Sequence, residues 1–421
     1  MSQKFVIQGG KKLEGEIEIR GYKNAAGAIL AASLLTEKEV TIGNLPLVED
    51  VNNTLEVLKS LGAKIDFKDE RTVSIKSDNI DPEQMDFKRI SKTRVSVLLI
   101  GPLLTRFKSF KIPRPGGDRI GLRPINVHLE ALKQLGAEIS EENDFYLFEV
   151  KNGLKGQEII LKEFSVTATE NLIMAAVLAK GKTIIKGAAA EPQVQDLALM
   201  LNNMGAKIEG AGNHTIFIEG VESLNGVQHQ IMPDLLEVGT FLVAAALTPG
   251  QVRIKNVRVG DLDLFLDKME EIGVDFKREK DSLIVNHSLN LKPVRIQALP
   301  YPGFPTDLLP IVVPLLTQAE GKSLIHDPLY ENRLNYVQEL RKMGADIEIV
   351  DPHRAFIFGK TPLRGVKIES WDIRAGASLV ISGLMAKGQT TIENIYQVDR
   401  GYEKIEVRLG QLGADIKRIE D

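Results

Sequence analysis

The segment PRPGGDRIGLRP, Pro113–Pro124, places one carboxylate, Asp118, among three prolines, three glycines and three arginines. Proline fixes the backbone φ angle and glycine releases it, so this segment is not the interior of a helix or a strand. It is a surface turn, a phosphate-binding loop or a mobile loop that carries a catalytic acid. A turn needs no cluster of arginines, and a phosphate-binding loop needs no acid at its centre. We therefore predict a mobile loop with Asp118 at its tip and Arg123 at its base, on an anionic substrate.

Cations elsewhere stand at or just before predicted helices: Lys23, Arg94, Arg333, Arg374 and Arg400. A helix N-terminus already carries partial positive charge, so a cation there suits a bound anion better than it suits the helix. Taken singly, each is an ordinary surface ion pair. Together they predict a site for a small anion of two or three charges, because arginine binds phosphate or carboxylate through two hydrogen bonds and lysine acts as a point charge.

Two further polar residues next to predicted helices have two interpretations each. Asn24 follows Lys23 and either caps the helix or contributes to the anion site. Asp307, in PGFPTDLLP, either caps a helix together with Thr306 or acts as a general base. The prolines on both sides of Asp307 favour the second interpretation, because a base must be held within reach of a hydroxyl.

These residues are carried by a unit that recurs six times. One phrase returns about every 70 residues, as LGAKID (61–66), LGAEIS (135–140), MGAKIE (204–209), IGVDFK (272–277), MGADIE (343–348) and LGADIK (412–417). A helical pattern precedes each copy and a β-prone run follows it, so the glycine is predicted to end a helix. Upstream of each copy lies a second phrase, such as KEVTIGN or GQTTIEN, whose alternating polar and apolar residues predict a half-buried strand.

The segments before these strands, such as ENLIMAAVLA and EVGTFLVAAAL, are apolar on nearly every side. Helices of this composition are predicted to be buried between sheets. TDLLPIVVPLL contains two prolines and still fits the same place. The chain is therefore predicted to be an α/β protein of six repeated units, each in the order helix, strand, helix, strand.

Composition excludes several classes of function. The chain has 421 residues, a formal net charge of −4, no cysteine and six scattered histidines. It therefore has no thiol nucleophile and no spacing typical of a metal site, and its charge favours no nucleic-acid partner. The sequence has no apolar run long enough to span a membrane and begins without the apolar core of a signal peptide. We expect a cytoplasmic location, no membrane insertion, no metal and no cofactor.

Seven segments resemble, in order and over the whole length, the UDP-N-acetylglucosamine 1-carboxyvinyltransferase family: GYKNAA, PGGDRIGLRP, PDLLEVGTFLVAAA, FPTD, ENR, DIRAGASLV and VDRGYEKIE. The resemblance implies the enolpyruvyl transferase fold, an inside-out α/β barrel in which three repeats form each of two domains with a cleft between them. By analogy, residues 22–231 form one domain with the mobile loop, and residues 1–21 and 232–421 form a discontinuous second domain. The GSKS-type and GTAxRP segments of the related shikimate-pathway synthase do not occur in this sequence.

The resemblance also implies the reaction and its substrates, phosphoenolpyruvate and UDP-N-acetylglucosamine. The enolpyruvyl group is transferred to the 3′-hydroxyl of the sugar and phosphate is released, the first committed step of peptidoglycan precursor synthesis. Asp307 acts on the hydroxyl and Asp118 protonates the methylene carbon, with Lys23 and Arg400 as further catalytic residues. The implied phosphoenolpyruvate site consists of Lys23, Asn24, Arg123, Arg333, Arg374 and Arg400. The implied sugar-nucleotide site consists of Arg94, Arg123, Pro124, Ile125, Asn126, Val127, Glu163, Phe164, Ser165, Val166, Asp307 and Leu329.

Two positions depart from the family pattern. The loop usually has cysteine where this chain has Asp118, so we expect resistance to fosfomycin, the epoxide antibiotic that alkylates this cysteine. Glu163 stands where a lysine is common, which leaves contact with the diphosphate to the backbone of residues 165–167. His128 is either structural or faces the uridine.

Two alternative functions stay open at this point. A non-catalytic paralogue that binds nucleotide sugars would have lost the acid or several cations, and this chain keeps them. Enolpyruvyl transfer to a different hydroxyl acceptor is kept open by Glu163. The sequence does not predict an oligomeric state.

Overall fold

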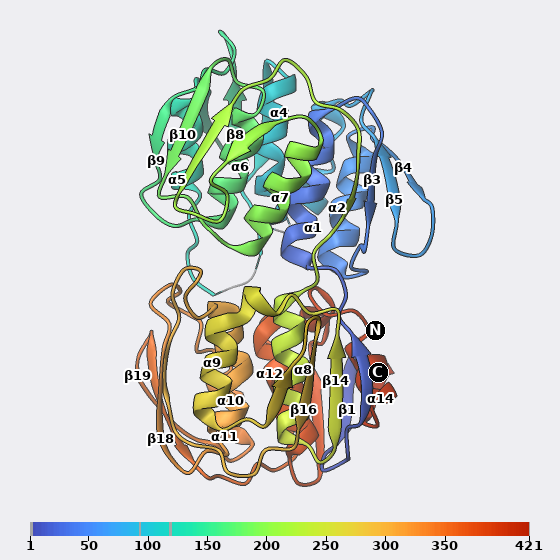
Figure 1. Ribbon diagram of the computed structural model, residues 1–421, viewed down its shortest axis with the longest axis vertical. Helices are drawn as coiled ribbons and strands as arrows, with labels where there is room; N and C mark the ends of the chain where they lie inside the picture. Colours follow the sequence, from blue (N-terminus) through green and yellow to red (C-terminus); the bar gives the residue numbers. More distant parts are fainter. Residues whose placement is uncertain (1–2, 92–93, 118–119, 421) are drawn as a thin grey trace. The chain divides into compact units, whose positions relative to one another are not determined.

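The computed structural model describes residues 3–91, 94–117 and 120–420. The chain divides into two compact units (Figure 1). The inserted unit contains residues 21–117 and 124–232. The terminal unit contains residues 3–20, 120–123 and 233–420, so both ends of the described chain belong to it.

The described residues of the inserted unit form three sheets, with strand orders β13-β3-β5-β4, β6-β8-β7 and β11-β12-β10-β9. The strands are β3 (Val40–Gly43), β4 (Lys64–Phe67), β5 (Val73–Lys76), β6 (Ser109–Pro113), β7 (Glu138–Glu142), β8 (Phe145–Glu149), β9 (Glu158–Ile160), β10 (Lys182–Lys186), β11 (Lys207–Glu209), β12 (Thr215–Glu219) and β13 (Val227–Gln230). The helices are α1 (Lys23–Ala32), α2 (Glu49–Ser60), α3 (Phe87–Ile90), α4 (Ile100–Arg106), α5 (Asn126–Gln134), α6 (Val166–Ala176) and α7 (Pro192–Asn203), with 3-10 turns η1 (Ser33–Leu35), η2 (Pro82–Gln84) and η3 (Val95–Leu99).

The described residues of the terminal unit form three more sheets, β15-β16-β14-β2, β17-β18-β20-β19 and β21-β22-β1-β23. The strands are β1 (Gln3–Gln8), β2 (Gly15–Glu18), β14 (Gln251–Lys255), β15 (Phe276–Arg278), β16 (Ser282–Asn286), β17 (Arg295–Gln297), β18 (Gly321–His326), β19 (Asp346–Asp351), β20 (Arg354–Gly359), β21 (Lys367–Glu369), β22 (Gln389–Glu393) and β23 (Asp415–Glu420). The helices are α8 (Leu235–Leu247), α9 (Asp263–Ile272), α10 (Leu309–Leu316), α11 (Val337–Lys342), α12 (Ile373–Met385), α13 (Tyr396–Asp399) and α14 (Ile405–Gln411), with 3-10 turns η4 (Val259–Leu262) and η5 (Thr306–Leu308).

One pairing rule repeats in these sheets. A central strand pairs in parallel with the strand that precedes the buried helix, as β18 does with β17, and antiparallel with the second strand after it, as β18 does with β20. At the two places where the chain crosses between units the parallel partners are exchanged, so that β14 pairs with β2 and β3 pairs with β13. In the last repeat, β1 is the strand that pairs antiparallel with the central strand β22. It lies between β22 and β23. The first strand of the chain therefore completes the last sheet.

The repeated glycines end helices, as the sequence predicts. All six have a positive φ angle, between 91° and 110°, which a residue with a Cβ rarely adopts. They are Gly62, Gly136, Gly205, Gly273, Gly344 and Gly413. The sequence signal is reliable because the left-handed conformation restricts the residue type more strongly than burial does.

The apolar helices form the interior of each unit. Every residue of α8 and of α10 is buried, and all but the last residue of α12 are buried. Figure 1 shows α8, α10 and α12 inside the terminal unit with strands on its outer side. The predicted α/β class with six repeated units is confirmed. None of the helices in the described ranges is both long and apolar enough to cross a bilayer.

Candidate active site

Lys23 opens α1 in the inserted unit, and its side chain is buried beside a carboxylate. Its Nζ lies 2.7 Å from Oδ2 of Asp50, a buried residue in the first turn of α2. The Asp50 carboxylate therefore already supplies part of the negative charge that the sequence predicts next to Lys23. Asn24 does not cap α1, because its side-chain amide donates a hydrogen bond to the Tyr22 hydroxyl at 3.2 Å.

Asp50→Asn should lower the free energy of unfolding by about 3 kcal/mol, because it leaves the Lys23 ammonium buried without a counter-charge. Urea unfolding measures the loss. The matched control is Glu56→Gln, which breaks the exposed pair of Lys59 and Glu56 and should change the free energy by less than about 1 kcal/mol. Equal, small losses in both variants would contradict the importance of burial at Lys23.

Pro124 and α5 lie near Arg94 in the same, inserted unit. Nη2 of Arg94 donates to the carbonyl oxygen of Pro124 at 3.3 Å, and α5 begins at Asn126 after the buried Ile125. His128 is buried, with Nε2 3.1 Å from the Thr167 hydroxyl. Burial, and secondly the charge of Arg94, lower the pKa of His128 to about 3. The ring is neutral at ordinary pH and links α5 to the start of α6, which supports the structural interpretation.

The predicted nucleotide-binding segment 163–166 leads into α6. Ser165 is the N-cap residue, and its hydroxyl accepts a hydrogen bond from the backbone amide of Ala168 at 3.3 Å. Glu163 and Phe164 are exposed, and the Phe164 ring lies 4.6 Å from the His214 ring. The first turn of α6 therefore presents backbone amides at its N-terminus, where a phosphate binds favourably.

In the terminal unit, two arginines hold the carboxylate of Asp307. Arg333 donates through Nη2 to Oδ1, and Arg374 donates through Nε to Oδ2 at 3.2 Å. Both arginine side chains are almost fully buried, while 28% of the Asp307 side chain is exposed. Asp307 and Thr306 do not cap the helix, since neither η5 nor α10 has a side-chain capping bond. The capping interpretation is therefore wrong.

The protonation state of Asp307 follows from these neighbours. Burial raises the pKa of its carboxyl group, but the charges of Arg333 and then Arg374, with their hydrogen bonds, outweigh burial and hold the pKa well below its usual range. Asp307 is thus ionised at neutral pH. It can accept a hydrogen bond from a hydroxyl, and its basicity is suppressed while both guanidinium groups remain on it.

Further residues position this cluster. Asp372 caps α12 by accepting from the amides of Arg374 and Ala375, each at 2.8 Å, and also accepts from Asn335 at 3.1 Å. The guanidinium carbon of Arg374 lies 5.2 Å from the centre of the Tyr402 ring.

An aromatic ring connects the loop base to the same cluster. The guanidinium carbons of Arg123 and Arg333 each lie 5.7 Å from the centre of the Tyr330 ring. The amide of Asn332 donates to the carbonyl oxygen of Ile120 at 3.1 Å. Leu329 precedes this ring and is 41% exposed. The sequence analysis did not select Tyr330, because an aromatic residue in a turn carries no distinct signal.

Two of the predicted helix starts are wrong. Arg333 lies in a series of turns, and α11 begins only at Val337. Arg400 follows the short helix α13 as its C-cap residue, and α14 begins only after Lys404, whose φ is +40°. Both arginines are nevertheless buried. Asp118 lies outside the described residues, and among the described residues no group of three or more His, Asp and Glu could hold a metal ion.

Comparisons with known proteins show the family of the chain. The family model described as EPSP synthase (3-phosphoshikimate 1-carboxyvinyltransferase) matches residues 7–409. The chain is 44% identical to UDP-N-acetylglucosamine 1-carboxyvinyltransferase 2 of Clostridium tetani, covering 99% of this chain and 100% of the relative. It is also 44% identical to the UDP-N-acetylglucosamine 1-carboxyvinyltransferase of Coxiella burnetii, covering 99% and 96%.

Solved structures give the same fold at lower sequence identity. The enolpyruvyl transferase NikO from Streptomyces tendae matches with a TM-score of 0.90 and 24% identity over 99% of both chains. EPSP synthase from Acinetobacter baumannii matches with a TM-score of 0.76 and 19% identity over 100% of both chains.

Proposed function

The chain belongs to the enolpyruvyl transferase family that includes the UDP-N-acetylglucosamine 1-carboxyvinyltransferases, and from this we propose that it transfers the enolpyruvyl group of phosphoenolpyruvate to the 3′-hydroxyl of UDP-N-acetylglucosamine. Phosphate is the second product. The reaction supplies a peptidoglycan precursor and takes place in the cytoplasm. The observation that supports this proposal most is the cluster of Asp307, Arg333 and Arg374, in which an ionised carboxylate that is partly exposed lies beside two buried guanidinium groups able to bind a carboxylate.

Phosphoenolpyruvate carries a carboxylate and a phosphate on one small frame. Arg333 and Arg374 receive the carboxylate in our proposal, since both already bind a carboxylate oxygen of Asp307. Lys23, Arg123 and Arg400 receive the phosphate, with Asn24 beside Lys23. Lys23 and Arg400 are both 7% exposed, so their charges act in a medium that screens them less than water does.

The sugar nucleotide is held, in the same proposal, by the residues around the loop base and the start of α6. Arg94 and the segment 123–127 form the first part, and residues 163–166 form the second. The capped N-terminus of α6 supports a diphosphate contact there, because its free backbone amides favour an anion. Asp307 and Leu329 complete the set.

The addition–elimination reaction needs a base, an acid and neutralising charge. Asp307 accepts the proton of the 3′-hydroxyl as its oxygen attacks the central carbon of phosphoenolpyruvate, and Asp118 donates a proton to the methylene carbon. Loss of a proton from the methyl group and departure of phosphate then restore the double bond. The arginines stabilise the anionic groups throughout.

A phosphate-release assay tests the assignment. Phosphate should appear only when both phosphoenolpyruvate and UDP-N-acetylglucosamine are present. Release with another hydroxyl acceptor and not with UDP-N-acetylglucosamine would replace the proposed acceptor. Binding of the sugar nucleotide without phosphate release would support a non-catalytic nucleotide-sugar-binding protein.

Glu163→Lys tests the effect of having a glutamate, where the family commonly has a lysine, in the proposed nucleotide-binding segment. An exposed glutamate next to a diphosphate repels it, so the lysine variant should bind UDP-N-acetylglucosamine several-fold more tightly without a change in turnover. Calorimetric binding and turnover measure the two effects. Glu142→Lys, on β7, makes the same charge change at another exposed glutamate and should leave affinity unchanged. Weaker binding in Glu163→Lys would show that the glutamate itself contacts the ligand.

A further inference from the structure

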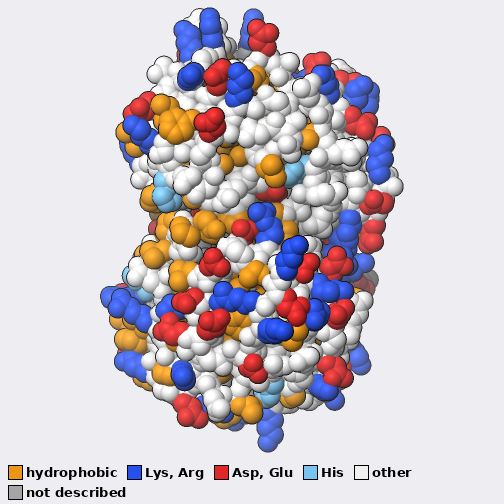
Figure 2. Space-filling view, viewed as in Figure 1, with side chains coloured by type: hydrophobic (Ala, Val, Ile, Leu, Met, Phe, Trp, Pro, Cys, Tyr) orange, Lys and Arg blue, Asp and Glu red, His pale blue; other side chains and the backbone are white. Residues whose placement is uncertain are grey.

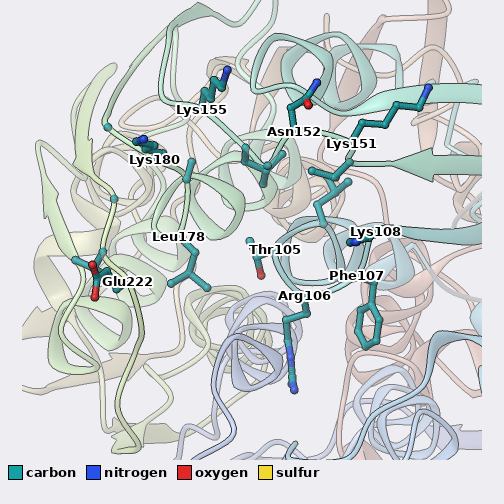
Figure 3. A pocket seen from close by; sticks show the side chains of 18 residues that line it. Thr105, Arg106, Phe107, Lys108, Lys151, Asn152, Lys155, Leu178, Lys180 and Glu222 are labelled. Atoms are coloured by element: carbon teal, nitrogen blue, oxygen red, sulfur yellow. The ribbon is translucent and has the colours of Figure 1, made fainter.

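A second concave site lies within the inserted unit, beyond the C-terminal ends of α4 and α6. Its volume is about 690 Å³, and its walls are residues 104–108, 150–155, 178–181 and 220–222 (Figure 3). Helix α6 has 11 residues, so this pocket lies roughly 16 Å from the cap of Ser165 at the other end of that helix. It is therefore separate from the residues assigned to the sugar nucleotide.

The described lining of this pocket is strongly basic. It contains Arg106, Lys108, Lys151, Lys155 and Lys180 against one carboxylate, Glu222. The whole chain has a net charge of −4, and the face shown in Figure 2 mixes both signs of charge. The excess of positive charge in the pocket is therefore local and does not reflect a protein surface that is basic as a whole.

Two of these cations are accounted for by the protein. Arg106 donates through Nη1 to the carbonyl oxygens of Leu34 and Ser77, at 3.1 and 2.7 Å, and Lys151 pairs with Glu138 at 2.6 Å. Arg106 is also the last residue of α4, where the partial negative charge of a helix C-terminus favours a cation. Lys108, Lys155 and Lys180 differ, because no ion pair joins any of the three to another described residue.

Backbone pairing brings these lysines together from separate segments. Lys155 and Lys180 are backbone partners in an isolated parallel β-bridge, and the amide of Val150 donates to the carbonyl oxygen of Lys108 at 2.8 Å. The bridge brings two cations to neighbouring segments of the pocket wall. A bound anion would offset the repulsion between like charges there.

The rest of the wall contains apolar side chains together with the polar Thr105 and Asn152. Leu104 and Leu154 are buried, and Leu178 and Phe107 also line the pocket. Figure 3 shows Leu178 and Thr105 in the middle of the view, with the basic side chains around them.

The volume of the pocket lies within the range of roughly 300–1,000 Å³ typical of small-molecule sites. We propose that this pocket binds an anion of two or more charges on a planar or apolar body, the chemistry of a nucleoside di- or triphosphate.

Calorimetric titration with ATP tests the site, with Lys108, Lys155 and Lys180 replaced together by alanine. The unmodified protein should bind ATP saturably, and the triple variant should bind it roughly tenfold more weakly or not at all. Lys23→Ala, at the substrate site, should keep ATP binding. Inorganic phosphate in place of ATP should bind much more weakly, because it cannot use the apolar wall. Binding should weaken in about 1 M salt, where charges are screened within roughly 3 Å.

Lys68, Lys88 and Lys133 provide the matched control, as three exposed lysines of the same unit outside the pocket. Their replacement by alanine removes the same charge and should leave ATP affinity unchanged. Both triple variants should release phosphate from the enolpyruvyl reaction at the normal basal rate, which separates this site from the proposed function. Absence of saturable ATP binding, equal weakening in both triple variants, or loss of ATP binding in Lys23→Ala would overturn the proposal.

Discussion

Asp307→Asn should lower turnover about 100-fold or more, the usual size of the effect of removing a positioned base. The amide keeps an oxygen that can accept a hydrogen bond from Arg333 or Arg374, but it cannot take the proton of the sugar hydroxyl. Phosphate release at saturating concentrations of both substrates measures the effect. Sugar-nucleotide affinity should change far less than turnover.

The low pKa of Asp307 makes this prediction more specific. The two guanidinium groups weaken the carboxylate as a base, and in the proposed site the substrate carboxylate would compete for them when phosphoenolpyruvate binds. As their hydrogen bonds move to the substrate, the pKa of Asp307 rises and its basicity increases. We therefore predict that binding of phosphoenolpyruvate increases the basicity of Asp307.

A matched carboxylate in the same unit is the control for Asp307. Asp351 pairs with Arg354 on the surface, and Asp351→Asn should leave turnover unchanged. Unfolding curves for each variant show whether the protein is folded under assay conditions. Near-normal turnover in folded Asp307→Asn would show that this carboxylate is only a structural partner of the two arginines.

Asp118→Asn should abolish most activity, because an amide cannot donate a carboxylic proton to the methylene carbon. Asp118→Cys should retain a substantial part of it, since a thiol with a pKa of about 8.5 is protonated at neutral pH. An ordinary aspartate titrates near 3.9, so the acid role requires Asp118 to lose water and face the anionic substrates, which raises a carboxyl pKa. Turnover of the three proteins measures the ranking, and full activity in Asp118→Asn would overturn the acid role.

Inactivation by fosfomycin is an independent test of the residue at position 118. The unmodified chain has no cysteine to alkylate, so its activity should not decay with time in the presence of the epoxide. Asp118→Cys should become sensitive to time-dependent inactivation. Inactivation of the unmodified protein would show that another side chain is alkylated.

The sequence predicts the fold well because its signals are local. The six glycines need a left-handed backbone angle, and the buried helices are apolar on all sides, so both can be recognised without a partner. Helix boundaries near Arg333 and Arg400 were predicted wrongly, because turns and a helix start share the same residue types there.

The candidate site is predicted less completely because its partners are distant in the chain. Asp50 resembles any acid in the first turn of a helix, and only the fold brings it to Lys23. Tyr330 likewise cannot be recognised as part of the site from the sequence, because only the fold brings Arg123 and Arg333 near its ring. The roles of these residues in binding and catalysis stay predictions.

The place of β1 between β22 and β23 has a consequence for biosynthesis. Residue 3 pairs with residue 420, so β1 is synthesised long before the two strands that it pairs with. The inserted unit is complete once Met232 has emerged and can fold during translation. The sheet of the terminal unit that contains β1 can close only after β23 has left the ribosome. A premature stop codon just before β23 would therefore leave β1 without its partner on one side and expose an edge prone to aggregation.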